Sequence, residues 1–163
     1  MTPSKKDFLR IDDFSLEELR AILATAREQK PRAQRHELPA SHPGRQLACV
    51  FAKPSLRTRV SFEIAMRQLG GGSLFITDKE IGMGTRESVK DVAKVLSRFV
   101  DGIMIRWFDQ GEVDELAEHA TVPVINGLTD LLHPCQVMAD IMTVEEHLGT
   151  IESKKAVTVA DGN

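Results

Sequence analysis

Short apolar runs alternate with amphipathic stretches along most of this sequence, and that alternation constrains the fold more than any other feature. The apolar runs predict strands at residues 47–52, 73–77, 102–106, 122–125 and 156–160. The stretches between them predict helices at 57–69, 87–99, 112–120 and 134–148. Parallel strands need crossover connections, so this order predicts an α/β fold in which a parallel sheet of about four strands carries helices on both faces.

Two of the predicted helices show their ends and faces clearly. Ser15 begins a capping-box sequence, and the apolar residues after it recur at helical spacing up to Pro31, so an N-terminal helix precedes the sheet. Residues 30–45 show no periodicity and predict a loop. In the helix at 57–69, Val60, Ile64 and Ala65 share an apolar face, and glycines at 70–72 end the helix.

Composition restricts the class of protein. The chain has 163 residues, 42% of them hydrophobic, and a net charge of −3, which is typical of a globular domain and does not predict nucleic acid as a partner. No apolar run reaches the roughly 20 residues of a membrane span, and no leader is recognisable, so we expect a cytoplasmic protein. Cys49 and Cys135 lack a C-x-x-C spacing, which argues against a disulfide framework or a zinc site.

Ligands of such sheets bind beyond the carboxyl ends of the strands, and the first of these loops is the most informative. Residues 53–59 run from a strand end directly into a helix start, where free backbone N–H groups attract an anion. Ser55 and Thr58 add hydroxyl groups, and the Arg57 guanidinium fits two phosphate oxygens. The sequence therefore predicts a phosphate site, with an ordinary capped basic helix as the alternative.

Two later loops place further polar side chains at the same edge. Arg106 ends an apolar strand, and the alternative for it is a surface charge paired with Asp109. His133 begins a helix and Gln136 follows one turn later, so the pair is suited to polarising a carbonyl and holding an adjacent NH₂ group. The alternative for His133 is a helix cap. A nucleophilic role for Cys135 is disfavoured because no third group would orient the pair.

Three motifs in this order resemble those of the aspartate/ornithine carbamoyltransferases. They lie at 51–63 (FAKPSLRTRVSFE), 100–106 (VDGIMIR) and 126–136 (NGLTDLLHPCQ), and it is their combination in this order that carries the resemblance. Cys135 in the His-Pro-x-Gln motif favours the ornithine branch of the family, since the aspartate branch typically carries threonine there. The lack of a G-x-G-x-x-G turn after the first strand makes a dinucleotide-binding domain the least supported alternative.

The resemblance implies one site for carbamoyl phosphate. The phosphate would be held by Ser55, the backbone of Leu56, Arg57 and Thr58. The catalytic groups would be Arg106, His133 and Thr58 on the carbamoyl oxygen, with Gln136 on the carbamoyl amide. Glu87 would orient Arg57 from behind. The resemblance implies no metal ion and no cofactor.

The resemblance also implies a domain organisation and a reaction. Residues 1–150 would form the carbamoyl-phosphate-binding domain, and 151–163 would begin a truncated ornithine-binding domain. The full-length protein would be a homotrimer that transfers the carbamoyl group to L-ornithine, giving L-citrulline in arginine biosynthesis or urea-cycle type chemistry, while this chain alone would not turn over. The alternatives are a carbamoyltransferase for N-acetylornithine, putrescine or aspartate, and a non-catalytic module that binds carbamoyl phosphate or phosphate.

Overall fold

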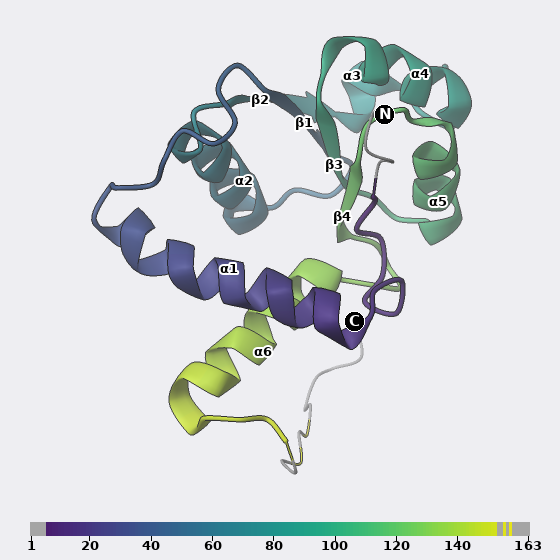
Figure 1. Cartoon of the computed structure of the whole chain (residues 1–163). Coiled ribbons are helices and arrows are strands. Elements are labelled where there is room, and N and C mark those ends of the chain that lie inside the picture. The colour runs from purple at the N-terminus through teal and green to yellow at the C-terminus, as the bar shows by residue number, and fades with distance from the viewer. Residues whose placement is uncertain (1–5, 153–154, 156, 158–163) are drawn as a thin grey trace.

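A four-stranded parallel sheet forms the centre of the computed structural model, which describes residues 6–152, 155 and 157 (Figure 1). The strands are β1 (Gln46–Phe51), β2 (Gly72–Thr77), β3 (Gly102–Arg106) and β4 (Val124–Leu128). The helices are α1 (Leu16–Gln34), α2 (Leu56–Gln68), α3 (Asp78–Ile81), α4 (Val89–Phe99), α5 (Gln110–His119) and α6 (Pro134–Leu148). The predicted α/β fold with an N-terminal helix is thus confirmed, whereas the strand predicted at 156–160 lies almost wholly outside the described residues.

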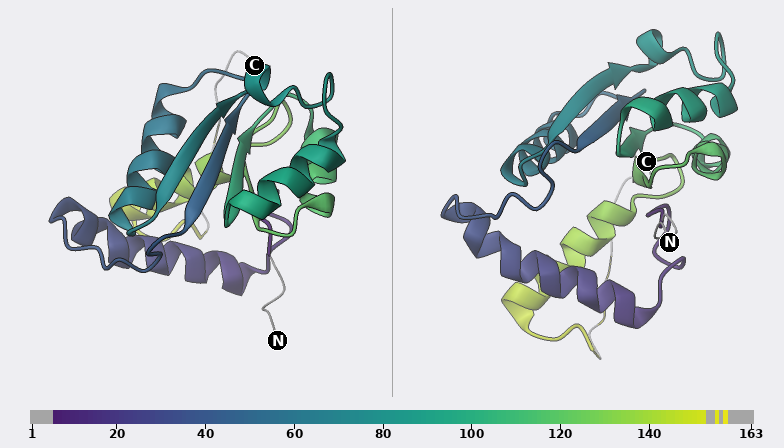
Figure 2. Two further views of the ribbon diagram at one scale, coloured as in Figure 1. Left: turned by 90° about the horizontal axis from the view of Figure 1, so that it is seen from above. Right: turned by 45° about the horizontal axis from the view of Figure 1, so that its top comes forward.

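Alternate residues of β1 enter two separate hydrophobic cores. Ala48 and Val50 pack into the core that α4 and α5 cover, while Cys49 and Phe51 pack with Met104 into the core on the α2 side. Figure 2 shows α2 and α6 on one side of the sheet and α4 and α5 on the other. Because β1 and β3 are covered on both faces, they read as continuous apolar runs, which is why the sequence located them so well.

The strand order β2-β1-β3-β4 places a topological switch point between β1 and β3. The connection from β1 leads through α2 to β2 on one side, and the connection from β2 returns across the sheet to β3 on the other side of β1. At such a point the loops after the two central strands separate to opposite faces and leave a crevice. The loop after β1 ends at Ser55, Thr58 lies in the first turn of α2, and β3 ends at Arg106.

Two expectations about the helices were wrong. Helix α1 continues through Pro31 to Gln34, so the first residues of the predicted 30–45 loop are helical; Pro31 is exposed, where water can bond the carbonyl that lacks its N–H partner. In α2, Val60 and Ile64 are 47% and 43% exposed, and it is Phe62 and Met66 that pack against the sheet. Helix α2 carries two stripes of apolar residues, and the apolar face named from the sequence is the one that points away from the sheet.

The end of the sheet also differs from the prediction. Strand β4 begins after Pro123, two residues later than expected, and continues through Asn126 and Gly127. Gly127 fits because a Cβ atom there would lie 2.5 Å from Met104 Sδ. The N-terminal segment pairs beside β4: Phe8 N donates to Val124 O at 2.8 Å. In the described part of the chain, no helix is both long enough and apolar enough to span a membrane.

Candidate functional site

The start of α2 presents a cluster of hydroxyl and backbone donors beyond β1. Ser55 is the N-cap: its Oγ accepts from Thr58 N at 3.3 Å and donates to Thr58 Oγ1 at 3.0 Å. Arg57, in the first turn, is exposed, and no acidic residue occupies that turn to compete for it. Ser55 is therefore a helix cap, as the alternative interpretation predicted. The helix start that it caps carries a partial positive charge and lies beside the cationic side chain of Arg57.

Arg106 and His133 converge on this helix start from two other strands. Arg106 Nη1 donates to Thr58 Oγ1 at 3.4 Å, and Asp109, proposed as its surface partner, instead caps α5 by accepting from Glu112 N at 2.9 Å. His133 occupies the N-cap position of α6 but makes no side-chain capping bond. Among these side chains, Arg106 therefore does not form the surface ion pair with Asp109, and His133 does not cap its helix through the imidazole.

Burial and neighbouring charges shift the pKa values of these two residues. Burial lowers the pKa of Arg106, and the charge of Arg57 lowers it further. Burial also lowers the pKa of His133, followed by the charge of Arg106, while Asp140 opposes this. Arg106 Nε and His133 Nδ1, like Asn126 Oδ1, are buried with no hydrogen-bond partner among the described residues. These atoms are closed to solvent, whereas the Arg106 and His133 side chains as a whole are partly exposed and line a cavity, so their other nitrogen atoms are the ones that can donate to a ligand oxygen.

Gln136 has a defined amide orientation. Its Nε2 donates to Asp140 Oδ1 at 2.8 Å, which leaves Oε1 as the acceptor for an external N–H group. Next to it, burial raises the pKa of the Cys135 thiol to about 11, and Cys135 Sγ lies 3.5 Å from the Asn126 carbonyl oxygen. A thiol in that state is not a nucleophile at neutral pH, consistent with the sequence argument against it.

These side chains share one open cavity of about 430 Å³ beyond the strand ends. It is lined by six residues singled out from the sequence and by five others: Ser55, Arg57, Thr58, Arg106, His133 and Gln136, with Ser61, Phe62, Leu128, Cys135 and Ala139. Residues about 80 positions apart in the sequence thereby form one surface. Ser61 and Phe62, noted from the sequence only as parts of the motif at 51–63, follow the helix cap Ser55 by about two turns.

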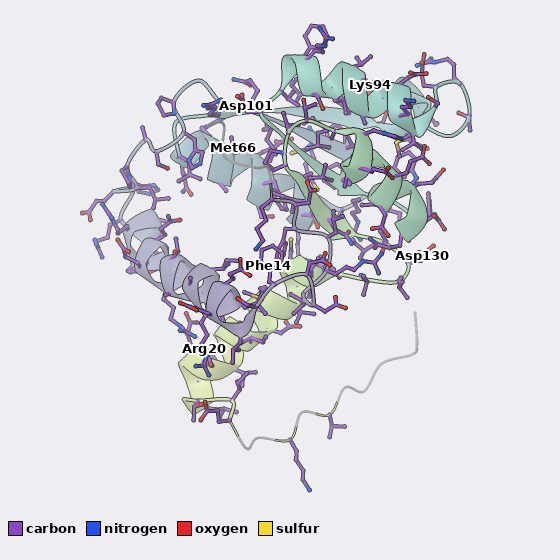
Figure 3. All side chains as sticks on the ribbon, turned by 45° about the vertical axis from the view of Figure 1, so that its right-hand side comes forward. Phe14, Arg20, Met66, Lys94, Asp101 and Asp130 are labelled. Atoms are coloured by element: carbon purple, nitrogen blue, oxygen red, sulfur yellow. The ribbon has the colours of Figure 1, made fainter. Side chains whose placement is uncertain are left out.

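The loops around the cavity are also tied to each other. Lys53, after β1, forms an ion pair with Asp130, after β4, and its Nζ lies 4.7 Å over the ring of Phe108, after β3. Figure 3 labels Asp130 in this region and Asp101 at the other end of the strands, directly before β3. The carboxyl ends of the strands therefore form one connected rim.

Two predicted site residues lie outside this cavity. Leu56 is the first residue of α2 and its side chain is 79% exposed, so it could contribute through its backbone N–H alone. The Glu87 carboxylate lies 3.8 Å from Arg86 Nε, and among the described side chains no ion pair joins Glu87 to Arg57. The orienting role of Glu87 stays a prediction that this geometry does not support.

The sequence argument missed three buried polar side chains directly behind the cavity: Gln110, Asn126 and Thr129. Gln110 was taken for a loop residue, and the other two were noted only as parts of a motif. Polar residues inside or directly after an apolar strand were the available signal, since burial of an amide or hydroxyl requires a hydrogen-bond partner. No cluster of three or more His, Cys, Asp or Glu side chains that could hold a metal ion occurs among the residues described.

The cavity has two chemically different ends. At one end a helix N-terminus, two hydroxyl groups and Arg57 suit an anion such as phosphate. At the other, Arg106 and His133 suit a carbonyl oxygen and Gln136 suits an NH₂ group. The fold and site define a switch-point α/β domain with a pocket for a small phosphorylated carbonyl compound.

The family follows from comparison with known sequences. Residues 6–146 match the sequence model of the family described as "Aspartate/ornithine carbamoyltransferase, carbamoyl-P binding domain". The chain belongs to the aspartate/ornithine carbamoyltransferase family, of which these residues are the carbamoyl-phosphate-binding domain. The ornithine carbamoyltransferase of Agrobacterium fabrum is 52% identical over 160 residues, covering 98% of this chain and 52% of that protein.

Solved structures agree in sequence and fold. Ornithine carbamoyltransferase from Pyrococcus furiosus superposes with a TM-score of 0.88 at 45% identity, covering 93% of this chain and 48% of that one. A mutant of N-acetyl-L-ornithine transcarbamylase, complexed with carbamyl phosphate and N-succinyl-L-norvaline, superposes with a TM-score of 0.77 at 36% identity, covering 91% and 50%. The chain spans about half the length of the relatives it matches.

Proposed function

We propose that this chain binds carbamoyl phosphate for transfer of the carbamoyl group to L-ornithine, as the first half of an ornithine carbamoyltransferase. The observation that carries the proposal is the convergence of Arg106 and His133 with Ser55, Arg57, Thr58 and Gln136 on one cavity beyond the ends of the strands. A relative of the same fold was solved with carbamyl phosphate, which supports this choice of ligand.

In this proposal the phosphate binds at the start of α2. The N–H groups of Leu56, Arg57 and Thr58 and the hydroxyl group of Ser55 donate to its oxygens, and the Arg57 guanidinium neutralises its charge. Arg57 is exposed in the ligand-free chain, so it reaches the phosphate at little desolvation cost. Phosphate is also the leaving group, and the same donors stabilise the charge that it carries away.

The carbamoyl group lies at the other end of the cavity. Arg106, His133 and Thr58 donate to the carbonyl oxygen, and the Gln136 Oε1 accepts from the carbamoyl NH₂ group. When the ornithine δ-amine attacks the carbonyl carbon, negative charge grows on that oxygen. Donors fixed in advance by the fold stabilise this charge more than they stabilise the neutral carbonyl, which lowers the barrier.

The acceptor amine and the assembly belong to the proposal for the full-length protein. We assign ornithine as the acceptor because the relatives at about 50% identity are ornithine carbamoyltransferases. For that protein we propose a homotrimer working in the cytoplasm in arginine biosynthesis, and for these 163 residues alone we propose binding without turnover. N-acetyl-L-ornithine is the competing acceptor, because a transcarbamylase for it shares the fold.

Calorimetric titration of the chain tests the binding step. Phosphonoacetamide, in which a methylene group replaces the bridging oxygen of carbamoyl phosphate, avoids hydrolysis during the titration. We expect Arg57→Ala and His133→Ala to weaken its binding by at least tenfold, since each removes a charged or oxygen-directed hydrogen bond worth about 1.5 kcal/mol or more. Arg67→Ala and His147→Ala, exposed residues on the same two helices, are the matched controls. Unchanged affinity in both site variants would contradict the proposal.

A further inference from the structure

A hydrogen-bonded cluster of buried polar side chains lies directly behind the proposed carbamoyl site. Gln110 at the start of α5 is 7% exposed, Thr129 after β4 is 4% exposed, and Asn126 within β4 is fully buried. These are the buried polar residues of the described chain, and all three lie at the carboxyl end of the sheet. Burial of three polar groups at one place is unfavourable unless each is hydrogen-bonded in a fixed arrangement.

Gln110 is the centre of this cluster. Its Oε1 accepts from Thr129 Oγ1 at 2.8 Å and from Asn126 Nδ2 at 3.1 Å, and its Nε2 donates to Asp114 Oδ1 at 2.8 Å. Asp114 in turn forms an ion pair with Arg10. The partners of Oε1 are both donors and the partner of Nε2 is a carboxylate, so the orientation of the Gln110 amide is determined.

The cluster joins the two loops that carry Arg106 and His133. Gln110 follows Arg106 by four residues, while Thr129 closes the turn before His133: its Oγ1 accepts from Leu132 N at 3.0 Å, and its N donates to Leu132 O at 2.8 Å. Backbone bonds from Trp107 N to Leu128 O and from Asp130 N to Phe108 O, both 2.9 Å, connect the same two loops. The side-chain amide of Gln110 adds a further link between the two loops, and this link ends on Thr129, within the turn itself.

We propose that Gln110 is a positioning residue that sets the place of His133 relative to Arg106, and so tunes recognition of the carbamoyl end of the ligand without touching it. Gln110 does not line the cavity, and its bond to Thr129 acts on the turn from behind. The phosphate end is held by the start of α2, to which none of the three side chains forms a hydrogen bond in the described structure. Loss of the Gln110 amide should therefore affect the two ends of the ligand unequally. The inference rests on the proposed function.

The bonding pattern also specifies which substitution fails and which rescues it. In Gln110→Glu, a carboxylate oxygen replaces Nε2 and faces the Asp114 carboxylate, so the two acceptors repel each other. Adding Asp114→Asn supplies an NH₂ donor at that place and restores a donor–acceptor pair, while the bonds from Thr129 and Asn126 to residue 110 are kept. Asp114→Asn alone still offers Gln110 an amide oxygen to donate to.

The test compares two ligands on one set of variants. Dissociation constants for phosphonoacetamide and for inorganic phosphate are measured by calorimetry on the wild-type chain, Gln110→Glu, Asp114→Asn and the double variant, with thermal unfolding as a check on folding. We expect Gln110→Glu to weaken phosphonoacetamide about tenfold and phosphate less than threefold, because a broken buried hydrogen bond acts at the carbamoyl end alone. The double variant should return the ratio of the two constants to within threefold of wild type.

Every outcome decides between the alternatives. Equal weakening of both ligands in Gln110→Glu, no weakening of either, or failure of the double variant to restore the ratio would overturn the positioning role. If Gln110→Glu does not fold, Thr129→Val removes the same bond from the other side and must show the same selective loss, or the inference is wrong. Failure of the wild-type chain to bind phosphonoacetamide would instead contradict the proposed function.

Discussion

We expect Arg106 to lower the free energy of unfolding of the chain without ligand, and we expect ligand binding to require it. Burial and the charge of Arg57 both lower its pKa, and its Nε is buried without a partner. Replacing it with methionine keeps an apolar stem and removes the unpaired donor and the repulsion. We expect Arg106→Met to raise the free energy of unfolding by about 1 kcal/mol, which for a domain of this size is about 3 °C in Tm.

The same substitution should reduce ligand binding. A charge-assisted hydrogen bond contributes about 2 kcal/mol, so we expect phosphonoacetamide affinity to fall roughly thirtyfold. Thermal unfolding in phosphate-free buffer and calorimetric titration measure the two effects separately, with Arg98→Met on the exposed end of α4 as the control. A Tm that drops by several degrees would show that Arg106 stabilises the fold, and an unchanged affinity would show that it does not contact the ligand; either result refutes this reasoning.

Three further predictions concern packing, pH and thiol reactivity. Gly127→Val should lower the free energy of unfolding by about 2 kcal/mol in a urea titration, because the added carbons meet Met104 Sδ, whereas Gly44→Val, with nothing within 4 Å but a positive φ, should lower it less. Because the pKa of His133 is lowered in the folded chain, the unfolded state binds a proton first as pH falls through about 6.5, so the free energy of unfolding should decrease from pH 7.5 to 5.5. His133→Asn should show a smaller decrease, and an equal one would contradict this assignment. Burial raises the pKa of Cys135 to about 11 and that of Cys49 to about 12, so neither thiol should react with iodoacetamide at pH 8 until urea unfolds the chain; rapid labelling of the native chain would be the contrary result.

The sequence predicted the sheet and the cavity well for a physical reason. Strands β1 and β3 are buried on both faces, so they are uniformly apolar, and the polar residue that ends such a run marks the edge of the sheet. Parallel strands bring their carboxyl ends together, so Ser55, Arg106 and His133 could be placed at one edge from their positions alone. Arg59 and Glu63 are four residues apart in α2, a spacing that favours an ion pair, and Arg59 Nε lies 2.8 Å from Glu63 Oε1.

What the sequence could not predict depends on tertiary partners. Helix α2 has apolar residues on two stripes, and the contact of Phe62 and Met66 with the sheet decides which one is buried. Within strand β4, the Asn126 Nδ2 group donates to Gln110 Oε1 and to the Leu9 carbonyl oxygen, and both partners come from distant parts of the chain, while Asn126 Oδ1 is buried without a partner. Gln110 itself belongs to no periodic pattern, so its role emerges only from the folded arrangement.

The most direct test of the account is a crystal structure of the chain with phosphonoacetamide. We predict phosphonate oxygens at the start of α2, within hydrogen-bond distance of Ser55, Arg57 and Thr58. We also predict the carbonyl oxygen at Arg106 and His133 and the NH₂ group at Gln136. A ligand bound in the reverse orientation, or held at another place without contact to Arg106 and His133, would contradict this prediction.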